Sequence, residues 1–148
     1  MNLNTIENYI ITKLTADVSG VLVKAWPNNP QEFLSEFTAP KGALLVRYNG
    51  SNFSFPEPNS QKVLIQDRDM EWIVTIFMRN AFGHDATTNY ADGIYTLIEG
   101  VRSSLSGETV TTLTDLTVFY PIRDGFVNEY NGVWVYEMAF GVIGPETE

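Results

Sequence analysis

Apolar side chains recur every three or four residues near the start of the chain and again over residues 90–105. In an α-helix this spacing places them on one face, so the pattern predicts two long amphipathic helices. We expect Asn4 to cap the first helix, which ends before Ser19 and Gly20, and the second to end at Gly107, a residue type favoured just after a helix C-terminus. The two apolar stripes are Leu3, Ile6, Ile10 and Leu14, and Tyr90, Ile94, Leu97, Ile98, Val101 and Leu105.

Two shorter runs, 21–26 and 43–48, are rich in apolar and β-branched residues and predict strands. Asn29 followed by Pro30 is typical of a helix start, so a short helix is expected there. Residues 49–60 contain three Asn, three Ser, two Pro and one Gly. These residue types favour turns, and the segment is therefore predicted to be a long loop.

The most continuously apolar segment is 72–78. A strand covered on both faces has this pattern, so we predict that it forms the centre of the sheet. Residues 62–66 are either its hairpin partner or the start of one long bent strand. Further along, Asn131-Gly132 is a strong signal for a tight turn, and it predicts a hairpin between 116–130 and 133–143. Five residues of the second run alternate onto one face, namely Trp134, Tyr136, Met138, Phe140 and Val142.

These elements predict an α/β fold of the α+β type. Strands joined directly are antiparallel neighbours, and strands separated by a long helix can be parallel, so a mixed, mainly antiparallel sheet is expected. The two long helices are predicted to pack together on one face. A chain of 148 residues has the usual size of one domain, and we expect a single domain over 1–148.

The composition narrows the classes of function. Nine basic residues against eighteen acidic ones give a net charge of −9, and the cations are scattered singly, so specific nucleic-acid binding is not expected. The chain contains no cysteine, which excludes disulfides and thiolate chemistry. No apolar run approaches the ~20 residues that span a membrane, and the N-terminus does not resemble a secretion signal. We therefore expect a cytoplasmic protein that binds no membrane and no cofactor.

Candidate catalytic or metal-binding groups are few. His84 is the single histidine and is followed by Asp85, but no nucleophile motif accompanies the pair, so a role in a loop or a helix cap is expected. Asp67, Asp69 and Glu71 alternate and can project their carboxylates to one side of a strand, where they would form either a hard-cation site or a solvated strand edge.

Two arginines and two phenylalanines are candidates for contacts. Arg47 and Arg79 lie in predicted strands and are expected to pair with carboxylates, either within the chain or between subunits. Glu137 lies on the strand face opposite Trp134 and would need a partner, for which Arg47, Arg79 or Arg123 could serve. Phe53 and Phe55 lie in the predicted loop and either fold back onto the core or anchor a protein partner.

Four ordered segments resemble the Mu-like phage tail terminator family, and the resemblance extends over roughly residues 5–143. The segments are Trp26-Pro27-x-Asn29-Pro30-Gln-Glu-Phe; Pro40-Lys-Gly-Ala-Leu-Leu-Val-Arg-Tyr48 with Gly50-Ser51; Arg79-Asn80-x-x-Gly83-His84; and Tyr120-Pro-Ile-x-x-Gly125-Phe-Val with Asn131-Gly-Val-Trp134-x-Tyr136.

This resemblance implies a structural role and no catalytic residue. Tail terminators are compact α/β domains that form a ring, usually hexameric, on the head-proximal end of the tail tube. The expected partners are other copies of the chain, the tail tube, the sheath, and the head-tail connector in a phage. The protein would assemble in the host cytoplasm and become part of the virion, or of a contractile injection particle. The candidate interface residues are Arg47, Phe53, Phe55, Arg79 and His84.

Two alternatives stay open. The chain could be another neck or tube component of the same kind of particle, since small ring-forming α/β domains recur there. A small enzyme that uses paired carboxylates such as Asp67 and Asp69 would instead have a concave pocket and acids of raised pKa.

The negative net charge of the chain suits a ring through which DNA passes, because a negative lumen repels the phosphates of the DNA.

Overall fold

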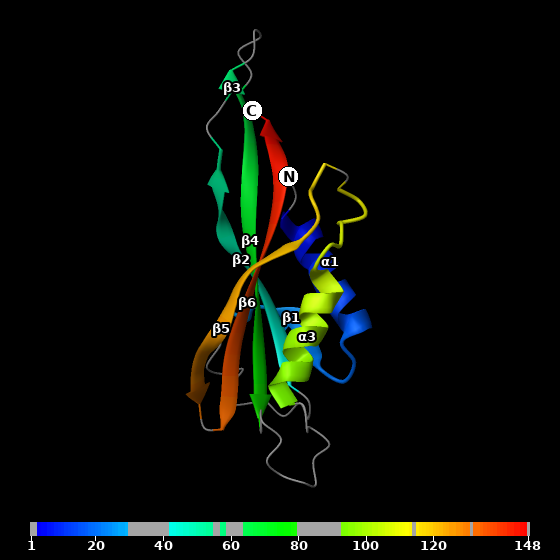
Figure 1. Cartoon of the computed structure of the whole chain (residues 1–148), viewed down its shortest axis with the longest axis vertical. Helices are drawn as coiled ribbons and strands as arrows, with labels where there is room; N and C mark the ends of the chain where they lie inside the picture. The colour runs from blue at the N-terminus through cyan, green and yellow to red at the C-terminus, as the bar shows by residue number, and fades with distance from the viewer. Residues whose placement is uncertain are drawn as a thin grey trace.

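One long strand, β4 (Leu64–Arg79), runs through the middle of the molecule, and the rest of the sheet forms around it (Figure 1). The computed structural model describes residues 3–29, 42–54, 57–58, 64–79, 93–113, 115–130 and 132–147, with the backbone alone at 57–58, 64–66, 79 and 146–147. The other elements are α1 (Leu3–Asp17), β1 (Leu22–Ala25), β2 (Ala43–Phe53), β3 (Glu57–Pro58), α3 (Gly93–Leu105), β5 (Tyr120–Tyr130) and β6 (Val133–Thr147).

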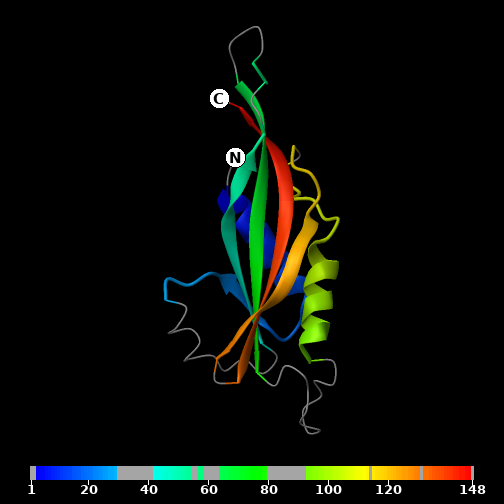
Figure 2. The same cartoon turned by 60° about the vertical axis from the view of Figure 1, so that its left-hand side comes forward.

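The sheet has the order β1-β2-β4-β6-β5, and β3 pairs with the outer part of β4. β1 is parallel to β2, and every other described pair is antiparallel. The prediction of a mixed, mainly antiparallel sheet is therefore confirmed. Figures 1 and 2 show that β2, β4 and β6 extend above both helices at the upper end of the molecule, so the sheet is longer than the helical layer.

Both helices pack on the same face of this sheet (Figure 2). The side chains of Ile6, Ile10 and Leu14 from α1 are fully buried, as are those of Val101 and Leu105 from α3. They contact alternate residues of the strands, because successive side chains of a strand point to opposite faces. The strand residues of this core include Leu44, Val46, Met70, Trp72, Val74, Ile76, Met138, Phe140 and Val142. The predicted helix stripes and the alternation from Trp134 to Val142 are confirmed.

A second, smaller cluster lies on the other face of the sheet. It contains Ala43 and Leu45 of β2, Phe77 of β4, and Val133 and Val135 of β6, with Trp26 packed against it. Residues 72–78 of β4 are buried at every position, so this strand is covered on both faces as predicted. The open question about residues 62–66 is answered for 64–66, which are the start of the long strand.

The structure corrects three sequence predictions. Residues 49–60 are not one loop, because β2 continues to Phe53 along β4, with a bulge between Tyr48 and Gly50 at the positive φ of 112° that glycine accepts. Residues 57–58 form β3. Asn4 lies inside α1 rather than capping it. Residues 116–119 precede β5, because Phe119 instead bonds to the chain after α3, donating to Glu108 and accepting from Gly107.

Two predicted elements extend beyond the described residues. The short helix after Asn29 lies outside them, as do the first residues of the 90–105 helix. α3 is described from Gly93 and is followed by Gly107, whose φ is 81°. This left-handed conformation is the one that glycine supplies after a helix C-terminus.

Candidate interaction surface

β5 forms one edge of the sheet, and its side chains are exposed on both faces. Nine of its eleven residues are exposed and the other two are half-buried. The exposed set includes four large apolar side chains, Ile122, Phe126, Val127 and Tyr130. An unpaired edge strand offers free N–H and C=O groups, and proteins usually blunt such edges with charge. Here the edge combines unpaired backbone with apolar side chains, which is typical of an interaction surface.

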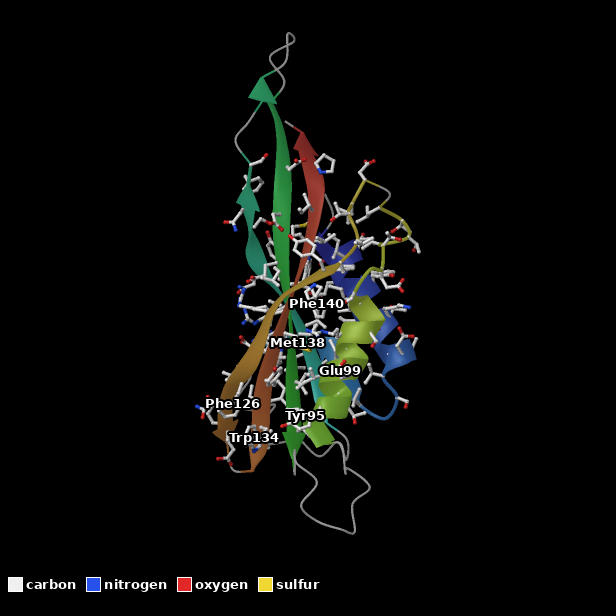
Figure 3. All side chains as sticks on the ribbon, in the orientation of Figure 1. Tyr95, Glu99, Phe126, Trp134, Met138 and Phe140 are labelled. Carbon is white, nitrogen blue, oxygen red and sulfur yellow. The ribbon has the colours of Figure 1, made fainter. Side chains whose placement is uncertain are left out.

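An aromatic cluster, Phe126, Trp134 and Tyr95, lies where the β5–β6 hairpin and α3 reach the same end of the molecule (Figure 3). The rings of Phe126 and Trp134 are 4.6 Å apart between centroids. Phe126 is 53% exposed and Tyr95, on α3, is 64% exposed. Large aromatic side chains are enriched at protein interfaces, so this cluster extends the surface from β5 onto the helical face.

A groove lies between α3 and β5, next to this cluster. Its floor contains the buried side chains of Met138 and Phe140, one wall is Arg102 of α3, and the other is residues 121–124 of β5. Its volume is about 150 Å³, which is room for one apolar side chain. At its edge, burial raises the pKa of the Tyr136 hydroxyl, and the neighbouring Asp124 carboxylate raises it further.

The other face of the sheet carries a polar band that crosses four strands. Arg47 of β2 pairs with Glu137 of β6 at 3.1 Å and donates to Asn49 at 2.8 Å. Asn49 in turn donates to Glu71 of β4, and Arg123 of β5 donates to the same carboxylate through its two terminal guanidinium nitrogens, one of them at 3.1 Å. Hydrogen bonding to Arg123 lowers the pKa of Glu71 below its ordinary value. The band ties both halves of the sheet together.

Tyr120 belongs to this band and reaches over β6 to β4. Its hydroxyl donates to Asp69 Oδ1 at 2.7 Å. The ring crosses directly above Gly141, where a Cβ atom would lie 2.7 Å from Tyr120 Cε2. Burial, followed by the Asp69 carboxylate, raises the pKa of Tyr120 to about 12. Only glycine at 141 leaves room for this crossing.

The polar band satisfies its own charges. Each of Asp69, Glu71 and Glu137 accepts a hydrogen bond from a side chain of the same chain. Within the described part of the chain, no group of three or more His, Cys, Asp or Glu residues is placed to hold a metal ion. In the same residues, no helix is both long and apolar enough to cross a membrane.

Comparison with protein families matches residues 10–146 to the family described as Gp37 protein. The chain belongs to the Gp37 protein family. This family is phage-related, so the chain is a phage-associated protein. A search of curated proteins finds no match.

Few of the interface candidates chosen from sequence can be placed in this Gp37-family chain. Arg47 is in the polar band and forms the predicted pair with Glu137. Phe53 ends β2 and is 52% exposed, beneath the Arg68 guanidinium at 5.5 Å, so it does not fold onto the core. Arg79 is the last residue of β4, but its side chain lies outside the described residues. Phe55 and His84 lie outside them as well, together with Asp85.

The sequence reasoning missed the most exposed aromatic residues in the described part of this Gp37-family chain. Nothing local in the sequence distinguishes Phe126 and Tyr95, because each occupies an ordinary position in a predicted strand or helix. The available signal was the pair Phe126-Val127, two consecutive apolar residues between Asp124-Gly125 and Asn128-Glu129. Such a pair puts apolar side chains on both faces, which is typical of a strand that is covered on both faces.

Proposed function

We propose that this protein is a tail terminator, a structural component of a phage tail or phage-like contractile particle. In this role several copies, six by resemblance, form a ring on the head-proximal end of the tail tube and stop its polymerisation. The ring then offers a surface to the head connector, or to a cap in a particle without a head. We propose no catalytic activity, and assembly in the bacterial cytoplasm.

The observation that carries this proposal is the exposed edge of β5 in a chain of a phage-related family. A ring subunit must present two different surfaces to its neighbours, because a cyclic contact is heterologous. β5 provides a surface of suitable kind, an eleven-residue edge strand with exposed Ile122, Phe126 and Tyr130. At ~3.4 Å per residue this edge is about 37 Å long, enough for a continuous contact between subunits.

The charges of the polar band also suit a structural role. Its carboxylates are held by side chains of the same sheet, Glu71 and Glu137 by arginines and Asp69 by Tyr120. The pKa of Glu71 is lowered, whereas a general acid needs a raised one. DNA and membranes are not proposed as partners, because a chain with a net charge of −9 repels phosphates.

The test is electron microscopy of the purified protein, alone and mixed with tail tubes of the same particle. Rings seated on one end of the tubes, and shorter tubes when the protein is present during their assembly, are the expected results. A protein that stays monomeric in the presence of tubes, or that binds along their whole length, would contradict the terminator proposal.

A further inference from the structure

The two edges of the sheet lie at the same height along the central strand. Leu22 of β1 pairs with Ala43 of β2, which pairs with Phe77 of β4. From the other edge, Asn128 of β5 pairs with Val135 of β6, which also pairs with Phe77. Ala25 and Asp124 both lead to Val74 in the same way. The four residues of β1 and the segment from Asp124 to Asn128 therefore flank the same stretch of β4 from opposite sides.

The two edges also run in opposite directions. β1 advances from the level of Phe77 to that of Val74, whereas β5 advances from Val74 to Phe77. When copies stand side by side around a ring axis roughly along the strands, β1 of one copy therefore meets β5 of the next in antiparallel orientation. This is the pairing that an added strand uses most readily.

We infer that the contact between neighbouring copies in the proposed ring is a strand pair, with β1 of one copy against the free edge of β5 of the next. The occupant of the exposed β5 surface is thus a second copy of this chain. This inference rests on the proposed ring function and specifies which surfaces of the subunit form the ring.

Side chains on the two edges complement one another in this pairing. Leu22, which is 45% exposed, lies on the face of the polar band next to Asn128 and Tyr130, and Val23 lies on the helical face next to Phe126. Lys24 comes opposite Gly125, where an added Cβ would meet nothing within 4 Å. A neighbour's Lys24 can therefore extend over Gly125 to Glu137, which pairs with Gly125 on β6.

The helical layer supports the same arrangement. α1 packs on β1 and β2 and α3 packs towards β4, while most residues of β5 stay exposed. Packed helices lie about 8–10 Å apart, whereas strands are ~4.8 Å apart, so two helices cover about four strands of five. In the continued sheet, α1 of the next copy comes to lie beside the aromatic cluster and the groove, where it would cover Phe126 and Tyr95.

The absence of cysteine makes the pairing directly testable by disulfide cross-linking. The main variant is Leu22→Cys with Asn128→Cys, two residues placed opposite each other on the same face. Closing a ring can shift neighbouring strands along one another. A shift that keeps each side chain on the same face moves the partner of Leu22 by two positions, to Tyr130, so the second variant is Leu22→Cys with Tyr130→Cys. The matched control is Leu22→Cys with Glu129→Cys, since Glu129 is exposed and adjacent but points to the other face.

After mild oxidation, non-reducing gels of the Asn128 or Tyr130 double variant should show a ladder beyond the dimer. The Glu129 control should give on the order of tenfold less product, because cysteines that do not face each other cannot be bridged without moving the backbone. Equal cross-linking at all three positions would overturn the inference. Dimers from Asn128→Cys alone would overturn it too, because they indicate a two-fold pairing of β5 with itself.

Mass photometry of the reduced variants separates this inference from the proposed function. Rings that assemble but give no ladder would refute the β1–β5 contact and leave the terminator proposal standing. A chain that forms no ring with tail tubes present would refute both. Thermal melting of each variant checks that the subunit itself is folded.

Discussion

Replacing Gly141 by alanine is expected to destabilise the protein through a residue on another strand. The new Cβ atom would lie 2.7 Å from Tyr120 Cε2 and still closer to two other atoms of that side chain. Non-bonded carbon atoms do not approach so closely, so the Tyr120 side chain must move from its position above β6. Its hydrogen bond to Asp69 is then lost, and the part of the ring that was buried becomes exposed.

The size of the effect can be worked from these contacts. A hydrogen bond to a charged group contributes about 1.5–3 kcal/mol, and re-exposure of part of the ring costs about 1 kcal/mol more. Alanine in a strand regains about 0.5–1 kcal/mol relative to glycine. The net loss is therefore about 1.5–3.5 kcal/mol, equivalent to a fall in Tm of roughly 3–14 °C for a domain of this size.

A double-mutant cycle with Tyr120→Ala tests the cause. Urea denaturation of Gly141→Ala, Tyr120→Ala and the double variant should show that alanine at 141 is neutral or slightly stabilising once the tyrosine ring is gone. Tyr120→Phe isolates the hydrogen bond. If Gly141→Ala keeps wild-type stability, or if its penalty persists without the Tyr120 ring, the crossing of Tyr120 over Gly141 does not explain the glycine.

Three further predictions concern the core, the polar band and the charge. Ile76→Asp places a charge at a fully buried position of β4 and should abolish cooperative melting by circular dichroism; a soluble variant with a sharp transition would contradict the central placement. Because the pKa of Glu71 is lowered on folding, the stability it contributes is present above its ordinary value of 4.5 and is lost as pH falls below it. Glu71→Gln should therefore flatten the loss of urea stability between about pH 6 and pH 3, and an unchanged profile would refute this. Duplex DNA should not bind at physiological salt, and micromolar, salt-sensitive binding in fluorescence anisotropy would disagree with the net charge of −9.

The elements that the sequence predicts well are those whose pattern is local. The stripe from Leu3 to Leu14 and the continuous run 72–78 report burial directly, because periodicity reflects the faces that a helix or strand covers. Residues 49–53 were predicted wrongly for the opposite reason. Their Asn, Ser and Gly residues favour turns, but β4 offers them a long partner strand, and pairing with β4 outweighs this local preference.

The candidate site was less predictable because exposure depends on strand order. Both strands of the hairpin around Asn131-Gly132 contain alternating apolar residues, and no local pattern shows that β6 lies inside the sheet while β5 lies at its edge. The polar band is equally non-local, since Arg47, Glu71 and Arg123 come from three strands far apart in sequence. Sequence reasoning identified Arg47 and Glu137 as needing partners, and the pairing of the strands supplied them.

An exposed apolar edge is a hazard to a soluble subunit, and β5 carries features that limit it. The ladder to β6 is interrupted between Pro121 and Arg123 and again between Phe126 and Asn128, and bulges of this kind twist an edge away from indiscriminate pairing. Pro121 also lacks the N–H that an added strand would bind. Repulsion between copies that each carry a net charge of −9 further slows random association. Residues 123–126, between the two interruptions, nevertheless keep a regular register with β6, so a matching strand can pair there when neighbours are held side by side.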